Sequence, residues 1–148
     1  MGDRGQALLF LLFMIVWVVD SFFLKFSIGL ARRVPLYGRL AGTAVLTAAA
    51  LMLMKASHRV LREMDGFHVI TRGAFGRVRH PLYLGSMLLF TAFWTSTLSL
   101  AALIILIIVF IFYDHIATYE EKKLEEKFGD DYLRYKEKVS KWMPKLPA

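Results

Sequence analysis

Cysteine is absent from this sequence of 148 residues. Its absence excludes a disulfide framework, a zinc–thiolate site, an iron–sulfur cluster and a catalytic cysteine. Charge is absent over a long stretch, because residues 82–113 contain no Asp, Glu, Lys or Arg. Hydrophobic residues make up 57% of the chain, above the roughly 45–50% of ordinary soluble domains. The composition therefore predicts a protein embedded in a lipid bilayer.

The formal net charge is +7, and its position along the chain indicates the partner. From Asp114 onward acidic and basic residues balance, so the excess arises in the first three quarters of the sequence, where basic residues flank hydrophobic runs. Such residues are typical of contacts with lipid head groups. We therefore expect membrane lipids as partners, no nucleic acid and no obligate protein partner.

The first half of the chain contains two hydrophobic runs. Residues 6–26 carry only Asp20 and Lys25 as charges, and a crossing of the hydrocarbon core takes roughly 20 residues. A cleaved signal peptide is the alternative for this run, but no A-x-A cleavage site follows it. A second helix is predicted over about 36–56. Two interpretations of Asp20 stay open: it lines a substrate tunnel, or it lies near the outer interface.

The uncharged stretch predicts a hairpin. As one helix its 32 residues would measure about 48 Å, which exceeds a hydrocarbon core of about 30 Å. We therefore predict helices over about 81–96 and 98–128 joined by a tight turn. Gly129 is a natural helix stop, and a tail helix is expected over about 131–141. The predicted fold is a single all-α domain, 1–148, with four transmembrane helices and a cytoplasmic helical tail.

The orientation follows from the loops. Basic residues are concentrated between 55 and 80, whereas the turn at 95–99 carries no charge. Basic loops stay on the cytoplasmic side, so the multi-pass protein is expected to have both termini and its active site there. Arg32 and Arg33 then lie outside, against the rule.

Two motifs flank the hairpin. Residues 79–85 read Arg-His-Pro-Leu-Tyr-Leu-Gly, and a Glu120-Glu121 pair follows the second helix of the hairpin. The first motif alone is compatible with an ordinary helix start at the interface. The second motif alone is compatible with a solvated helix face. A hairpin returns the chain to the side that it left, so it brings His80 close to Glu120. Adjacent glutamates point about 100° apart on a helix, and only one is expected to face the site.

These motifs, with Leu124, Phe128-Gly129, Tyr132, Tyr135 and Val139 after them, resemble the isoprenylcysteine carboxyl methyltransferase family. More broadly they are similar to membrane methyltransferases that include phospholipid N-methyltransferases. The resemblance covers about Phe67 to Pro144.

The resemblance implies S-adenosylmethionine as cofactor, S-adenosylhomocysteine as product, no metal, and a lipophilic or lipid acceptor from the bilayer. The implied cofactor-binding residues are Phe67, His68, Val69, Ile70, Phe75, His80, Pro81, Leu82, Tyr83 and Glu120.

One position departs from the family. The carboxyl methyltransferases carry an Arg one turn before the first Glu, and Ile116 stands there in this sequence. A bidentate carboxylate clamp is therefore missing. An amine or thiol acceptor fits the neighbouring Asp114 or His115, either of which could accept a proton. Phosphatidylethanolamine, a prenylcysteine carboxylate and a small thiol stay open as acceptors, as does a non-enzymatic lipid-binding module.

Overall fold

The computed structural model describes residues 2–63 and 67–144, and helices make up the elements in that part of the chain. The first helix, α1, spans Gly2–Val18 and continues as a π-helical turn, η1, over Val19–Leu24. A 3₁₀ helix, η2 (Ile28–Arg32), leads into α2 (Leu36–Arg62). A second 3₁₀ helix, η3 (Gly73–Gly76), precedes α3 (Pro81–Thr97). The chain ends with α4 (Leu100–Phe128) and α5 (Asp130–Lys138).

Within residues 2–63 and 67–144, three helices are long and apolar enough to cross a membrane: Arg4–Leu24, Leu36–Arg62 and Leu100–Phe128. The predicted all-α fold is thus confirmed for the described residues, and three of its four predicted transmembrane helices are candidate membrane spans. The predicted hairpin also forms, with α3 of 17 residues as its shorter arm. The second predicted helix was too short, because α2 continues past residue 56 to Arg62 and carries its basic last turns with it.

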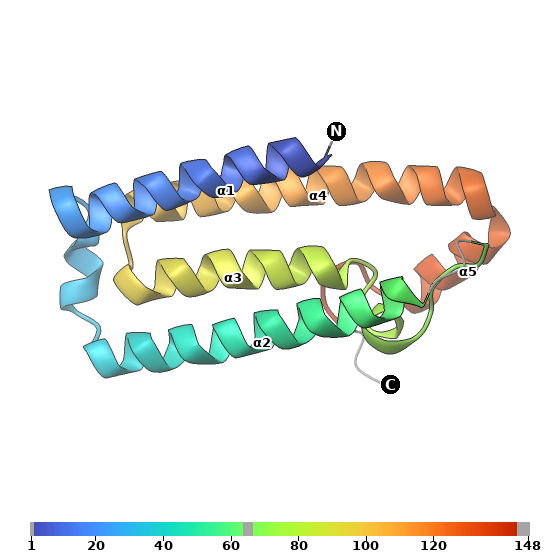
Figure 1. Ribbon diagram of the computed structural model, residues 1–148, viewed down its shortest axis with the longest axis horizontal. Helices are drawn as coiled ribbons and strands as arrows, with labels where there is room; N and C mark the ends of the chain where they lie inside the picture. The colour runs from blue at the N-terminus through green and yellow to red at the C-terminus, as the bar shows by residue number, and fades with distance from the viewer. Residues whose placement is uncertain (1, 64–66, 145–148) are drawn as a thin grey trace.

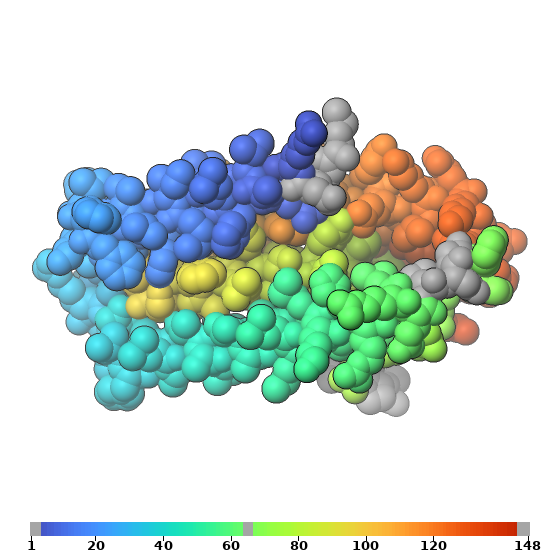
Figure 2. Space-filling view, in the orientation of Figure 1, coloured from blue at the N-terminus to red at the C-terminus, as the bar shows by residue number. Residues whose placement is uncertain are grey.

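The helices lie side by side along the length of the molecule (Figure 1). α1 packs against α4, and α3 lies between this pair and α2. The core between α1 and the hairpin is aromatic and aliphatic, with Phe13, Phe90 and Val109 buried. Phe13 meets Phe90 edge to face at 4.9 Å. On the face turned to the viewer in Figure 2, α3 is visible between α1 and α2.

The contact between α2 and α3 depends on the absence of a side chain at Gly85. A Cβ there would lie 2.6 Å from Met54 Cγ and 3.2 Å from the carbonyl oxygen of Ala50. Small residues permit such close approach of helices in membranes. The closeness of α2 and α3 fixes where the end of α2 stands relative to His80, the residue before α3.

The hairpin turn explains how the carboxylate of Asp20 can be buried. α3 ends at Thr97, and Leu98 after it adopts a left-handed φ of 50°. The Ser99 hydroxyl caps α4 by accepting from Ala102 N at 3.0 Å. Asp20 Oδ2 in turn accepts from the hydroxyls of Ser27 and Ser99, both at 2.5 Å. The buried carboxylate is thus satisfied by the turn. These contacts place Asp20 beside the hairpin turn at the end of the bundle. They favour the interpretation that Asp20 lies near an interface over the interpretation that it lines a substrate tunnel.

The opposite end of the bundle holds the polar segments. α4 extends past the end of α1, and the chain then reverses into α5 beside the loop between α2 and α3 (Figure 1). The reversal uses Gly129, whose φ of 52° is open to glycine, so the predicted helix stop at this residue is confirmed. Tyr132, Tyr135 and Val139 are buried on one face of the tail. This end therefore brings together both sequence motifs.

Candidate active site

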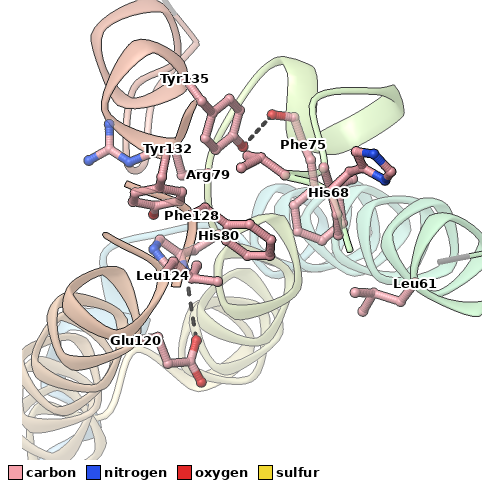
Figure 3. A pocket seen from close by; sticks show the side chains of 12 residues that line it. Leu61, His68, Phe75, Arg79, His80, Glu120, Leu124, Phe128, Tyr132 and Tyr135 are labelled. Carbon is pink, nitrogen blue, oxygen red and sulfur yellow. Dashed lines mark hydrogen bonds and ion pairs between the residues drawn. The ribbon is translucent and has the colours of Figure 1, made fainter. Parts of the chain in front are cut away.

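A cavity of about 260 Å³ lies where α2 ends, α3 begins and the tail folds back. Its lining consists of Leu61, His68, Val69, Ile70, Phe75, Arg79, His80, Glu120, Leu124, Phe128, Tyr132 and Tyr135. A second hollow of about 230 Å³ shares several of these residues and adds Pro81, Leu82 and Tyr83. In Figure 3 the tail tyrosines and the end of α4 face His68 and Phe75 across the first cavity.

The fold brings together all the predicted cofactor residues except Phe67. His68, Val69, Ile70, Phe75, His80 and Glu120 line the first cavity, and Pro81, Leu82 and Tyr83 line the second. Phe67 is 80% exposed and belongs to neither lining. The resemblance assigned Phe67 to the cofactor site together with residues 68–70. In the structure the loop leaves Phe67 exposed and outside both linings.

The two adjacent glutamates have different surroundings, as their helical spacing predicts. Glu120 is half exposed, and its Oε1 accepts from the Tyr83 hydroxyl at 2.5 Å. Its Oε2 lies 4.0 Å from His80 Nδ1. Glu120 therefore presents a carboxylate to the cavity while Tyr83 holds it in place.

Glu121 is buried and belongs to an ion-pair network. Its Oε1 lies 2.9 Å from Arg79 Nε and 3.0 Å from His80 Nε2, and its Oε2 accepts from Arg79 Nη2 at 3.3 Å. This bidentate pairing is the strong form of an arginine–carboxylate contact. Glu121 thus orients His80 from one side of the ring and leaves its Nδ1 toward the cavity.

Aromatic rings hold His80 from the other directions. The ring of Tyr83 lies nearly parallel to that of His80, with centroids 5.8 Å apart and an interplanar angle of 8°. Trp142, from the end of the tail, lies 5.7 Å from the same ring. The imidazole is 7% exposed, so its orientation is fixed before any ligand binds.

The tail forms one wall of the cavity, and the cofactor assignment from sequence did not include it. The aromatic stripe of Tyr132 and Tyr135 predicted an amphipathic helix, which was the available signal. The Tyr135 hydroxyl donates to the carbonyl oxygen of Phe75 at 2.7 Å, as the dashed line in Figure 3 shows. Burial raises the pKa of Tyr135 to about 12, so this donor keeps its proton at neutral pH.

Residues 139–142, here called the tail strap, fasten that wall to the start of α3. Arg79 donates from Nη1 to the carbonyl oxygens of Val139 at 2.5 Å and Lys136 at 3.2 Å. Its backbone N–H donates to the Ser140 carbonyl at 2.9 Å. Arg79 is the first residue of the motif before α3, but its role in joining α3, α4 and the tail is visible only in the structure.

The two residues predicted on the acceptor side lie outside the linings of these two cavities. Asp114 Oδ1 accepts from Lys141 Nζ at 2.5 Å and from Trp142 Nε1 at 2.9 Å, so it anchors the tail strap. His115, the next residue, is exposed. The structure does not bring either residue together with His80 and Glu120, and their action on an acceptor stays a prediction.

These features define a helical protein with three candidate membrane spans and, at one end of its bundle, a pocket whose largely apolar lining includes His68, Arg79, His80 and Glu120. The sequence model of the phospholipid methyltransferase family matches residues 39–131, from α2 to the start of α5. The match covers more than half of the chain, and the chain belongs to this family. The family relationship expected from the Arg-His-Pro and Glu-Glu motifs is confirmed.

Three individual relatives illustrate this relationship. Methanethiol S-methyltransferase 1 of Bradyrhizobium diazoefficiens is 31% identical over 98 residues, which cover 55% of this chain and 33% of that protein. Protein-S-isoprenylcysteine O-methyltransferase of Saccharomyces cerevisiae is 35% identical over 92 residues, 60% of this chain and 38% of that protein. An uncharacterized protein of Haemophilus influenzae is 44% identical over 64 residues, 42% of this chain and its whole length. The chain thus spans little more than a third of the two named enzymes.

Proposed function

We propose that this chain is an S-adenosylmethionine-dependent methyltransferase that acts on a lipophilic acceptor entering from the bilayer. The observation that carries the proposal is the convergence of His68, Phe75, His80 and Glu120 on one cavity. His80 and Glu120 come from the two motifs that flank the hairpin, and His68 and Phe75 come from the segment before α3. They meet in a chain of the phospholipid methyltransferase family.

The groups around the cavity match the chemistry of the cofactor. Its ammonium or its ribose hydroxyls would bind the half-exposed carboxylate of Glu120. Its carboxylate would lie near His80 and the N-terminus of α3, where the helix dipole favours an anion. Its adenine would pack against aromatic rings such as Phe75 and Tyr135. The donor set therefore fits this group.

When bound, S-adenosylmethionine would supply an electrophilic methyl group on a sulfonium. The chain's own residues align the reactants and exclude water, which are the main contributions available for such a displacement. Tyr83 holds Glu120, and Arg79 and Glu121 hold His80. With the cofactor so held, its methyl carbon would be open to the lone pair of an acceptor, and S-adenosylhomocysteine would be the other product.

The proposal includes a fourth membrane crossing by α3. This helix has 17 residues and no charged side chain, and at about 1.5 Å per residue it measures about 26 Å. That is at the short end of the range for crossing a bilayer. With four crossings, the basic segment 55–80, both termini and the pocket lie on the cytoplasmic side.

The names of two relatives suggest two kinds of methyl acceptor, an isoprenylcysteine carboxylate and a small thiol. Ile116, one helical turn before Glu120, supplies no carboxylate clamp. Asp114 or His115 would assist an acceptor that loses a proton, and in that role they are the proposed catalytic residues. A lipid-binding module without enzymatic activity is the alternative of another class, and family membership weighs against it.

The test is a thermal shift of the detergent-purified full chain with S-adenosylmethionine. At 100 times the dissociation constant, binding adds about 2.7 kcal/mol to the free energy of unfolding. We expect this shift in the wild type and in Glu126→Ala, a matched glutamate on the exposed side of α4. We expect its loss in Glu120→Ala and His80→Ala. No shift with either the cofactor or S-adenosylhomocysteine in the wild type would refute the proposal.

A further inference from the structure

The two ring nitrogens of His80 have different surroundings. Nε2 lies 3.0 Å from Oε1 of the buried Glu121. The guanidinium of Arg79 pairs with the same carboxylate at 2.9 Å, and Lys136 Nζ of α5 lies 3.8 Å from its Oε2. An ionised carboxylate between such cations only accepts hydrogen bonds. Nε2 is therefore the nitrogen that carries the proton in this contact.

Nδ1 is the nitrogen that this network leaves open. In a neutral imidazole with its proton on Nε2, Nδ1 holds a lone pair and can accept a proton. It lies 4.0 Å from Oε2 of Glu120, which exceeds a hydrogen-bond distance, and the dashed line to Glu120 in Figure 3 follows this separation. His80 lines both hollows of the site, so the lone pair is available inside the site.

The ring is also held as a base needs to be held. A buried carboxylate on the far nitrogen fixes the tautomer and the direction of a histidine, which is the arrangement that enzymes use for proton transfer. Packing against Tyr83 and Trp142 completes this support. A histidine that only filled space would be expected to have both nitrogens satisfied. The support of one nitrogen and the openness of the other therefore indicate a chemical role.

Other groups that can take a proton are less well placed. Asp114 already accepts hydrogen bonds from the tail strap, and His115 is exposed. Neither lines the two hollows, so they can take a proton only after it has left the site. Glu120 accepts from Tyr83 and is expected to bind the cofactor.

We propose that His80 is the general base of the reaction and that its Nδ1 removes the proton of a thiol acceptor. The inference rests on the proposed function, to which it adds a catalytic residue inside the site. The sulfur–hydrogen bond of the acceptor breaks, the proton goes to Nδ1, and the electron pair left on sulfur becomes the nucleophile for the methyl group. Glu120 and Glu121 stabilise the imidazolium that forms, which then returns its proton to water. The cofactor's carboxylate is left to the N–H groups at the start of α3.

The tautomer is tested on the full chain in detergent, without cofactor, by ¹⁵N NMR of protein labelled at its histidine nitrogens. The chain has four histidines, and loss of one set of signals in His80→Gln identifies those of His80. We expect the wild type to show a protonated Nε2 and an unprotonated Nδ1 at the pH of the activity assay. A proton on Nδ1, alone or together with one on Nε2, would overturn the proposal.

Catalysis is tested with an alkanethiol and with thiophenol, a more acidic thiol that is largely ionised at neutral pH. His80→Gln keeps an N–H for Glu121 and removes the basic lone pair. At saturating cofactor it should lower kcat for the alkanethiol about 100-fold or more, the usual contribution of a general base, with little change for thiophenol. Equal losses for the two thiols would mean a role in binding alone and would overturn the proposal.

His58→Gln is the matched control, because His58 is exposed on α2 and lies outside both linings. It should leave both rates and the signals of His80 unchanged, and an alkanethiol loss equal to that of His80→Gln would refute the assignment. A wild type that binds the cofactor and methylates neither thiol would refute it too. Failure of the proposed function is recognised separately, as absence of the cofactor thermal shift in the wild type.

Discussion

At the scale of single residues, the neighbouring glutamates have different surroundings, from which we expect different roles. Glu121 is buried between Arg79 and His80, whereas Glu120 is half exposed toward the cavity. Sequence alone shows two adjacent carboxylates on a helix. Their separation into two roles follows from the 100° between their side chains and from which one meets Arg79.

Glu121→Gln is expected to destabilise the protein by about 3–5 kcal/mol, because it leaves the buried charge of Arg79 without its partner. Glu120→Gln is expected to change stability by less than about 1 kcal/mol and to weaken cofactor binding. Unfolding monitored by circular dichroism in detergent, beside cofactor titration, separates the two effects. Equal stability of the two variants would contradict this division.

For Asp114, support of the tail strap and the proposed proton transfer lead to different outcomes. Asp114→Ala removes the acceptor of Lys141 and Trp142, so a role in the strap alone predicts a lower Tm and weaker cofactor binding, with no change in the shape of the pH–rate profile. Asp114→Asn keeps an acceptor and should recover part of the Tm. If Asp114 instead takes the acceptor's proton, Asp114→Asn would keep the Tm and lose one limb of the pH–rate profile.

At the scale of elements, the close pair of α2 and α3 sets the width of the site. Gly85→Val would push a branched side chain into Met54 and the Ala50 carbonyl, and overpacking of this kind costs about 1–3 kcal/mol. Gly38→Ala is the control, since a Cβ there meets nothing within 4 Å. Thermal unfolding of both variants measures the difference. A Gly85→Val protein as stable as Gly38→Ala would show that the two helices can separate freely.

The helices themselves were predictable, because each depends on a local signal. The uncharged stretch is too long for one crossing, Pro81 suits a first helical turn, and Gly129 ends a helix. The meeting of His80 and Glu120 was also predictable, since a hairpin requires it.

What sequence could not supply is the direction of side chains in irregular segments. The loop before η3 turns Phe67 outward although its neighbour His68 lines the cavity. The strap is a second case, because carbonyl acceptors for Arg79 exist at every residue and only the fold selects those of Lys136 and Val139. No particular type of residue in the sequence marks where such contacts will form.

At the scale of the whole molecule, the absence of cysteine makes the topology directly testable. Tyr37→Cys and Glu126→Cys place one thiol at each end of the bundle, at exposed positions. With a cytoplasmic pocket, an impermeant maleimide should label Tyr37→Cys in intact cells and Glu126→Cys only after the membrane is opened. Both variants are expected to keep the stability of the wild type within about 0.5 kcal/mol. The reverse labelling pattern would invert the orientation.

The tail strap also has a consequence for biosynthesis. Chains fold from their N-terminal side as they are made, and residues 139–142 are synthesised after every helix that they fasten. The bundle can therefore assemble in the membrane before Arg79 has received its carbonyl partners and before Trp142 covers His80. Assembly of the bundle and completion of the pocket are separate events, and a chain released without residues 139–142 would keep the helical scaffold and leave the pocket unfinished.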